Sequence, residues 1–305
     1  MTGTRGRYAP SPTGEVHLGN ASTALLAWLS ARSQGGAFVM RLEDLDGPRV
    51  RPGAAERIAE DLRWLGLDWD EGYDVGGPYA PYVQSARFDR YRDALERLRS
   101  SGHVYPCFCS RKDVAAAASA PQQPGDETPY PGTCRDRADA PPGRRPAWRF
   151  RMASEAASAF DDAVFGRFVA PLPTDFVVWR NDGTPAYQLA VVVDDAAMRI
   201  TEVVRGEDLL VSTLRQLALY RALGFAAPRF AHAPLLLGAD GVRLSKRHDG
   251  TTLAALRDAG WRPEAVVGRL AAWLGLRPEP TPTPARSLIA DFDLRRVKKG
   301  PGPFF

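Results

Sequence analysis

The chain has 305 residues, of which 44% are apolar, and this composition is typical of a globular protein with a sizeable core. Lys and Arg outnumber Asp and Glu by 40 to 36, so the formal net charge is +4, which is compatible with a nucleic-acid partner without requiring one. The sequence has no run of 18 or more apolar residues and no N-terminal signal pattern. It therefore argues against export and membrane spanning and predicts a cytoplasmic protein.

The residues from Arg7 to Asn20 predict a strand that breaks into a loop and enters a helix. Prolines and a glycine precede His-Leu-Gly-Asn, and an alanine-rich apolar run over 21–31 follows. Because the first N–H groups of a helix and the positive end of its dipole attract anions, we expect a polyphosphate above this loop. His17 and Asn20 are spaced to point the same way, and Gly19 leaves room for a flat ring.

The rest of the chain predicts alternating strands and helices. A short buried strand is expected at 37–42, and helices are expected within 49–65 and 88–101, so a parallel βαβ unit is the natural assembly. Further strands are expected at 148–151 and 200–204, and further helices at 214–223 and 263–274.

A β-hairpin is predicted across residues 176–195. Its two expected strands are rich in valine and aromatic residues, and Asn-Asp-Gly-Thr-Pro separates them. The strand at 200–204 leads into Arg-Gly-Glu-Asp, and charged residues at the carboxyl end of a strand are typical of ligand sites in α/β proteins. A later loop, 243–247, lies between glycines and is expected to carry Lys246 onto a phosphate.

The three cysteines, Cys107, Cys109 and Cys134, argue against a disulfide framework because their number is odd. They lie in a proline- and alanine-rich insertion that has few apolar residues to hold it together, so a structural zinc would supply folding energy there. Three buried cysteines without metal are the alternative. Candidates for the fourth ligand are Tyr130, His103, Asp113 and Asp136.

Four blocks, in this order, resemble the catalytic core of class I glutamyl-tRNA synthetases: the opening motif, residues 41–46, the run 175–208, and residues 243–247. His-Leu-Gly-Asn at 17–20 stands at the place of the HIGH signature, with Asn20 replacing its last histidine. Arg-Leu-Ser-Lys-Arg at 243–247 stands at the place of the KMSKS signature, with arginines replacing its outer lysines. The resemblance implies an α/β fold: a Rossmann-like class I aminoacyl-tRNA synthetase catalytic core with a zinc-containing insertion and a short helical C-terminal segment.

The resemblance also implies roles for individual residues. The catalytic residues would be His17, Asn20 and Lys246, and ATP would be bound by His17, Gly19, Asn20, Ser245 and Lys246. Glutamate would be bound by Arg7, Ala9, Ser11, Glu43, Tyr187 and Arg205, with both arginines on its side-chain carboxylate and Glu43 on its ammonium group. One structural zinc per chain would be held by Cys107, Cys109, Tyr130 and Cys134.

Only 58 residues follow Arg247, so no anticodon-binding domain is expected. This length resembles a truncated branch of the family, the glutamyl-Q tRNA(Asp) synthetases. Their resemblance implies ATP- and Mg²⁺-dependent activation of L-glutamate without tRNA, followed by transfer to the queuosine at the wobble position of tRNA(Asp). The expected partners are therefore L-glutamate, ATP and queuosine-containing tRNA(Asp), with no membrane, and the protein is expected to be a monomer.

The expected division of the chain has four parts. Residues 1–105 form the first half of the catalytic core, 106–185 the insertion with the zinc site and an acceptor-type subdomain, 186–250 the second half with the KMSKS-like loop, and 251–305 a helical segment. Three alternatives stay open: a short glutamyl-tRNA synthetase charging the tRNA 3′ end, a non-catalytic tRNA-binding paralogue, and a nucleotidyltransferase. The last of these leaves Arg7, Glu43 and Arg205 unexplained. His103 and His232 are expected to be structural.

Overall fold

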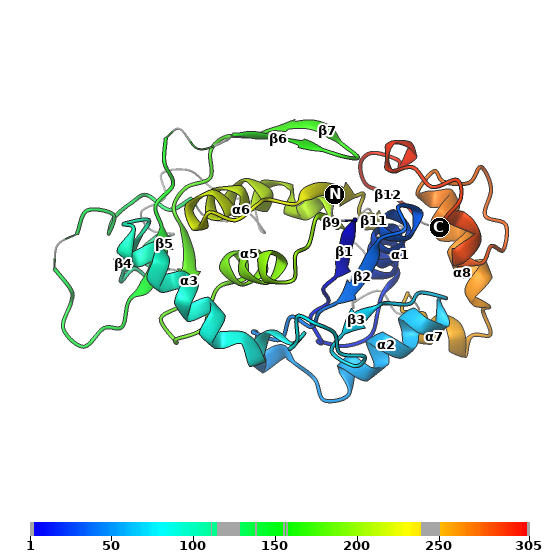
Figure 1. Ribbon diagram of the computed structural model, residues 1–305, viewed down its shortest axis with the longest axis horizontal. Coiled ribbons are helices and arrows are strands. Elements are labelled where there is room, and N and C mark those ends of the chain that lie inside the picture. Colours follow the sequence, from blue (N-terminus) through cyan, green and yellow to red (C-terminus); the bar gives the residue numbers. More distant parts are fainter. Residues whose placement is uncertain are drawn as a thin grey trace.

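A computed structural model of the chain describes residues 3–110, 112–114, 129–137, 139–154, 156, 158–238 and 251–303. The molecule is elongated, with strands β4 (Val104–Cys107) and β5 (Ala147–Phe150) toward one end and helix α8 (Pro263–Trp273) at the other (Figure 1). The KMSKS-like stretch with Ser245 and Lys246 lies outside the described residues.

Parallel strands form the centre of the molecule. Strands β1 (Arg5–Tyr8), β2 (Ala37–Met40) and β3 (Glu71–Gly72) pair in this order, and β9 (Glu202–Gly206) pairs in parallel with β10 (Arg229–Ala233). The Thr201 N–H donates to the Arg5 carbonyl at 3.0 Å, which brings β9 alongside β1. Helix α1 (Leu18–Ser33) connects β1 to β2, and α6 (Leu210–Leu223) connects β9 to β10. The predicted parallel βαβ unit is confirmed, and a second such unit follows it.

Both faces of these strands are buried, as expected for a parallel sheet covered by helices. Phe38 and Met40 of β2 pack in the same core as α1, whereas Val39 between them packs with α3 (Phe88–Ser100) and α5 (Tyr187–Ala197). On β9, Val204 likewise packs in the core of α1, and Val203 packs with α3 and α5. The continuous apolar sequence of β2, Ala-Phe-Val-Met, follows from this double burial.

The stretch predicted as an insertion contributes strands to a separate antiparallel sheet. Strands β4, β5 and β8 (Phe176–Trp179) pair antiparallel in that order, which confirms the strand predicted at 148–151. Strands β6 (Ala159–Asp162) and β7 (Gly166–Val169) form a hairpin whose first strand pairs with β10. The hairpin thereby joins the insertion to the central strands.

The hairpin predicted over residues 176–195 is wrong. Its first half is strand β8, but Tyr187–Ala197 form helix α5. The apolar run Leu-Ala-Val-Val-Val has no decisive period, and residues 189–195 are all buried, so neither face of the helix is marked by polar residues. Tyr187 therefore begins a helix and is not a residue of a strand.

Helix α2 (Ala54–Trp64) and the C-terminal helices complete the core on the α1 side. Helices α2, α7 (Leu253–Asp258) and α8 contribute to the same hydrophobic cluster as α1, and short strand β11 (Leu236–Leu237) pairs with β12 (Gly302–Pro303). This confirms the predicted helix at 263–274. Short 3₁₀ helices occupy Gly47–Arg49, Gln84–Arg87, Glu207–Leu209, Ala285–Leu288 and Leu294–Arg296. Among the described residues, no helix combines the length and apolarity that a membrane crossing requires.

Candidate active site

A pocket of about 270 Å³ opens where the carboxyl ends of β1 and β9 meet the start of α1. Such a position at the carboxyl ends of parallel strands is where open α/β sheets bind ligands. Nine of the residues predicted from the sequence line this one pocket: Arg7, Ala9, Ser11, His17, Gly19, Asn20, Glu43, Tyr187 and Arg205.

The start of α1 forms one wall of the pocket. His17 is the N-cap residue, and its Nδ1 accepts the Asn20 backbone N–H at 3.4 Å. A Cβ atom at Gly19 would lie 3.2 Å from His17 Nδ1, so glycine lets the imidazole lie over the first turn. The helix N-terminus and these side chains together provide a positive, hydrogen-bonding wall suited to phosphate.

The segment that begins at Thr251 lies directly against this helix start. The Leu18 N–H donates to the Thr251 carbonyl at 2.9 Å, and the Leu253 N–H donates to the Val16 carbonyl at 2.8 Å. Leu236, just before residues 239–250, lines the pocket. On either side of residues 239–250, Leu236 therefore lies at the pocket and Thr251 lies at the start of α1.

Four alternating charges lie along the wall of the pocket that contains Arg7 and Glu43. Arg41 is fully buried and donates through Nη1 to Asp195 at 2.7 Å and through Nη2 to Glu43 at 3.0 Å, while Arg7 Nε donates to Asp195 at 3.4 Å. Burial raises the pKa of Glu43, although Arg41 opposes this. Burial also opposes ionisation of Asp195, but Arg41 and Arg7 hold its pKa below the ordinary value. This network fixes the Arg7 guanidinium and the Glu43 carboxylate at the pocket wall.

Arg205 differs from Arg7 because its hydrogen-bond partners are all neutral. It is only 4% exposed, and it donates to His232, Gln216 and Thr213 at 3.2, 2.7 and 2.7 Å. Within the part of the chain that the structure describes, Arg205 makes no ion pair. Burial lowers the pKa of this guanidinium. A buried cation at a pocket wall, without an ion-pair partner among the described residues, favours an anionic ligand.

Several residues around these arginines were not predicted from the sequence. Asp195, Thr213 and Gln216 all contact a pocket arginine, and His232 does so in addition to its expected structural role. The available signal was a polar residue inside an otherwise apolar element. Asp195 follows Asp194 directly after the valine run of α5, and His232 lies among the buried apolar residues of β10.

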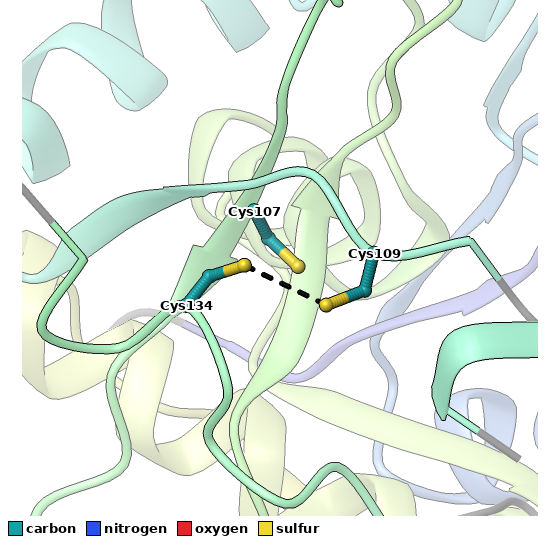
Figure 2. A group of neighbouring side chains, drawn as sticks. All are labelled: Cys107, Cys109 and Cys134. Carbon is teal, nitrogen blue, oxygen red and sulfur yellow. Dashed lines mark hydrogen bonds between the residues drawn. The ribbon is translucent and has the colours of Figure 1, made fainter. Parts of the chain in front are cut away.

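The three cysteines gather on the insertion (Figure 2). Their sulfur atoms all lie within 4.8 Å of one another, with Cys109 and Cys134 3.5 Å apart. The Tyr130 hydroxyl lies 3.4 Å from the Cys107 sulfur and 3.8 Å from the Cys109 sulfur, and it accepts the Cys134 N–H at 2.8 Å. Three thiols with one phenol oxygen fit a four-coordinate zinc, which favours sulfur ligands.

The other three candidates for a fourth ligand have different contacts. His103 hydrogen-bonds to Ser101 at 2.8 Å, Asp113 accepts the Ser110 N–H at 2.7 Å, and Asp136 pairs with Arg151 at 3.2 Å. Tyr130 is therefore the member of that set which the fold brings to the cysteines.

Arg149 adds positive charge to the cluster. Its Nε donates to the Cys107 sulfur at 3.1 Å, and its guanidinium lies 3.8 Å from the centre of the Tyr130 ring. Burial opposes ionisation of Cys134, but the Phe108 backbone N–H and the Tyr130 hydroxyl lower its pKa to about 7. These surroundings favour the thiolate of Cys134, the form that binds metal, whereas burial and the hydrogen bond with Cys134 raise the pKa of Cys109 to about 11.

The family model of class I tRNA synthetases (E and Q), catalytic domain, matches residues 4–287. The chain belongs to this family. The match confirms the class I synthetase fold and the ligase membership that the motifs predicted, and residues 4–287 of this synthetase-family chain include the pocket described above.

Curated relatives of this synthetase-family chain fall into two groups. Proteins named glutamyl-Q tRNA(Asp) synthetase from Symbiobacterium thermophilum and Nitratidesulfovibrio vulgaris are 55% and 50% identical over 97% of this chain, and the matches cover 94% and 98% of those proteins. A glutamate–tRNA ligase from Geobacter sulfurreducens is 43% identical over the full chain, which spans only 64% of that ligase. The crystal structure of a glutamate–tRNA synthetase from Elizabethkingia anophelis is similar, with a TM-score of 0.86, 33% identity, and coverage of 99% of this chain and 68% of that chain.

Proposed function

We propose that this protein activates L-glutamate with ATP, without requiring tRNA, and transfers the glutamyl group to the queuosine at the wobble position of tRNA(Asp). The observation that carries the proposal is the shared pocket, which is lined by Arg7, Glu43 and Arg205 together with the start of α1. Relatives that are similar over nearly their whole length bear the name of this activity, which supports the choice of acceptor.

The first half-reaction needs no enzyme nucleophile. The glutamate α-carboxylate attacks the α-phosphorus of ATP, the bond to the β-phosphate oxygen breaks, and pyrophosphate leaves with that electron pair. Catalysis is then positioning together with stabilisation of phosphate charge, to which Mg²⁺ bound with ATP would contribute. We assign the phosphates to the start of α1 with His17 and Asn20, and adenine to Gly19. Ser245 and Lys246 would bind the ATP from the opposite side.

The amino acid is assigned to the arginine side of the pocket. Arg205, which has only neutral protein partners among the described residues, would receive the side-chain carboxylate together with Arg7. Glu43 would receive the ammonium group, and Ala9, Ser11 and Tyr187 would complete the site. A neutral side chain such as that of glutamine would leave the Arg205 charge uncompensated.

The second half-reaction is acyl transfer. A hydroxyl oxygen of queuosine attacks the carbonyl carbon of the adenylate, an ester bond forms, and AMP leaves with the electron pair of the broken bond. The proton lost from the hydroxyl balances the charge of the AMP phosphate. Positioning of the two reactants again supplies most of the rate enhancement.

We assign one structural zinc to Cys107, Cys109 and Cys134 with Tyr130. The assignment is supported by the compact set of three sulfurs and by the tyrosine hydroxyl among them. The metal would stabilise the insertion, which buries few apolar side chains around the cluster, and it has no part in the chemical steps.

Pyrophosphate exchange tests the first half-reaction. Labelled pyrophosphate should enter ATP in the presence of glutamate alone, and glutamine and aspartate should support much less exchange. A requirement for tRNA would remove the tRNA-independent part of the proposal. The absence of any exchange, with or without tRNA, would favour a non-catalytic tRNA-binding paralogue.

Transfer of labelled glutamate identifies the tRNA site that accepts the glutamyl group. Queuosine-containing tRNA(Asp), the same tRNA from cells that lack queuosine, and tRNA(Glu) are compared, and each product is cut with a nuclease. Label in the anticodon fragment of the first tRNA alone is expected. Label in the 3′-terminal fragment of tRNA(Glu) would instead support the short glutamyl-tRNA synthetase, which the 43% identity to a glutamate–tRNA ligase keeps as the second candidate.

A further inference from the structure

We infer that His232 and Asp162 are positioning residues that aim Arg205 into the pocket, so that one guanidinium N–H group remains for a carboxylate of the substrate. They would therefore determine specificity for an acidic side chain without touching it. This inference deepens the proposed function and rests on it for the identity of the substrate.

The hydrogen bonds of Arg205 leave one of its guanidinium N–H groups without a protein acceptor among the described residues. A guanidinium carries five N–H groups in a fixed plane. Nε donates to His232 at 3.2 Å, Nη1 donates to Gln216 at 2.7 Å, and Nη2 donates to Thr213 at 2.7 Å and to the Leu209 carbonyl at 3.4 Å. These bonds use four of the five groups, and the remaining one is on Nη1. Arg205 lines the pocket, so this group is available to a ligand there.

The chemistry of arginine fixes the tautomer of His232. Because the Arg205 Nε–H only donates, His232 Nε2 must accept, and the proton of the neutral ring must lie on Nδ1. Nδ1 lies 2.6 Å from Asp162 Oδ2, which accepts that proton's hydrogen bond. Both side chains have no exposed surface. Burial, and then the Arg205 charge, lowers the pKa of His232, although Asp162 opposes this. The ring is thus held neutral, in one tautomer, against Arg205.

Asp162 is itself held in place. Its Oδ1 accepts the backbone N–H groups of Val164 and Phe165, each at 2.9 Å, in the turn of the β6–β7 hairpin. Its pKa is held below the ordinary value by His232 and these N–H groups, although burial opposes this. An ionised aspartate that accepts from the turn and from the imidazole is a rigid support.

The register of the sheet brings these residues together. Arg205 of β9 and His232 of β10 are register partners, and Asp162 of β6 is the partner of Phe230 on the other side of β10. Three neighbouring strands thus contribute one residue each to a line that runs from the hairpin to the pocket. A side chain that only filled space here would not need an acceptor at the position of Nε2.

Three substitutions test whether His232 orients Arg205 or only fills space. In His232→Gln the end of the side chain reaches about as far as Nε2, so an oxygen remains for Arg205. His232→Leu keeps the volume and removes the acceptor. Asp162→Asn keeps the shape but no longer fixes the Nδ1 proton. His103→Leu is the matched control, because His103 stacks on Phe150 and hydrogen-bonds to Ser101.

Steady-state pyrophosphate exchange is the first measurement, with thermal unfolding to check that each variant folds. His232→Leu should raise KM for glutamate by about 10-fold to 100-fold, as expected for a lost hydrogen bond to a charged group, and leave KM for ATP within about twofold. His232→Gln should recover most of this loss, and His103→Leu should change neither constant. Equal effects of Gln and Leu on KM for glutamate, or equal rises in both KM values, would overturn the positioning role.

The second measurement does not depend on the substrate. Nitrogen NMR of the wild-type imidazole should show Nδ1 protonated and Nε2 bare from about pH 8 down to about pH 6.5, the ordinary imidazole pKa, because Asp162 and Arg205 both face the ring and Asp208 is the other charged group near it. Protonation of Nε2 within that range would overturn the inference. If wild-type protein supports no exchange with glutamate, the proposed function fails while this spectrum still decides whether His232 positions Arg205.

Discussion

Replacing Arg205 by methionine removes a cation that is 4% exposed and has no carboxylate among its partners in the described residues. If that cation binds the glutamate side chain, its loss should cost about 2 to 5 kcal/mol of binding energy, the usual range for truncating a buried hydrogen-bonded charge pair. At about 1.4 kcal/mol per tenfold, kcat/KM for glutamate should fall by about 30-fold to about 4,000-fold. The exposed Arg221 on α6 supplies the control, and Arg221→Met should change kcat/KM by less than about twofold.

Thermal unfolding supplies an independent test of the same substitution. Glutamate at about one hundred times its Kd should stabilise the wild-type protein by about 2.7 kcal/mol. A chain of 305 residues unfolds with an entropy of about 0.6 kcal/mol/K, so the midpoint should rise by about 4 °C. Arg205→Met should lose most of this rise. A variant that keeps both the rise and kcat/KM within about threefold of wild type would show that Arg205 does not bind the substrate carboxylate.

Three further substitutions test other parts of the site. Gly19→Ala places a Cβ about 3.2 Å from His17 Nδ1 and should raise KM for ATP about tenfold in pyrophosphate exchange; an unchanged KM would contradict the role of this helix start. Cys134→Ser should lose the single equivalent of zinc detected by mass spectrometry and lower the unfolding midpoint, whereas zinc-free but equally stable wild-type protein would remove zinc from the site. Lys246→Ala should lower kcat for exchange by about 100-fold to 1,000-fold and leave the glutamate-induced rise in unfolding midpoint intact; an effect confined to KM would argue against transition-state stabilisation.

The helix start at the pocket was predictable because its causes are local. A proline- and glycine-containing loop followed by an apolar run predicts a strand, a turn and a helix, and the structure has β1 ending at Tyr8 and α1 beginning at Leu18. The position of His17 as N-cap residue follows from the same few residues. The backbone geometry that suits phosphate therefore needs no distant part of the chain.

The arginine side of the pocket was not predictable in this way. Arg7 meets Asp195 across 188 positions of sequence, and Arg205 meets His232 through the pairing of β9 with β10. Neither contact has a local signature, so the family resemblance supplied both arginines but not their partners. The wrong hairpin over 176–195 had a related cost, because in a strand Asp194 and Asp195 would lie on opposite faces of a sheet, whereas in helix α5 both are buried.

The two neighbouring aspartates of α5 should have separable roles. Asp194 has no exposed side-chain surface and accepts from Arg87 at 2.6 Å and from Gln84 and Tyr91, each at 2.8 Å. Asp194→Asn places an N–H group where donors now point and breaks a buried ion pair, at a cost of about 3 to 5 kcal/mol. With an unfolding entropy of about 0.6 kcal/mol/K for this chain length, the unfolding midpoint should fall by about 5 to 8 °C. Glutamate kinetics measured well below that midpoint should change little.

Asp195→Asn should instead affect glutamate kinetics more than stability. Its Oδ1 accepts hydrogen bonds from Arg7 and Arg41, whereas its Oδ2 is buried without a partner among the described residues. An amide nitrogen at the Oδ2 position therefore fits without loss of a hydrogen bond. The lost charge loosens Arg7, and kcat/KM for glutamate should fall more than stability. Because the folded pKa of Asp195 lies below its unfolded value of about 4, its stabilising contribution is present above about pH 4 and is lost as the pH falls through the folded value. The Asn variant should therefore lose less stability on acidification below pH 4 than wild type does, and equal losses in the two proteins would show that the Asp195 charge is not what holds Arg7.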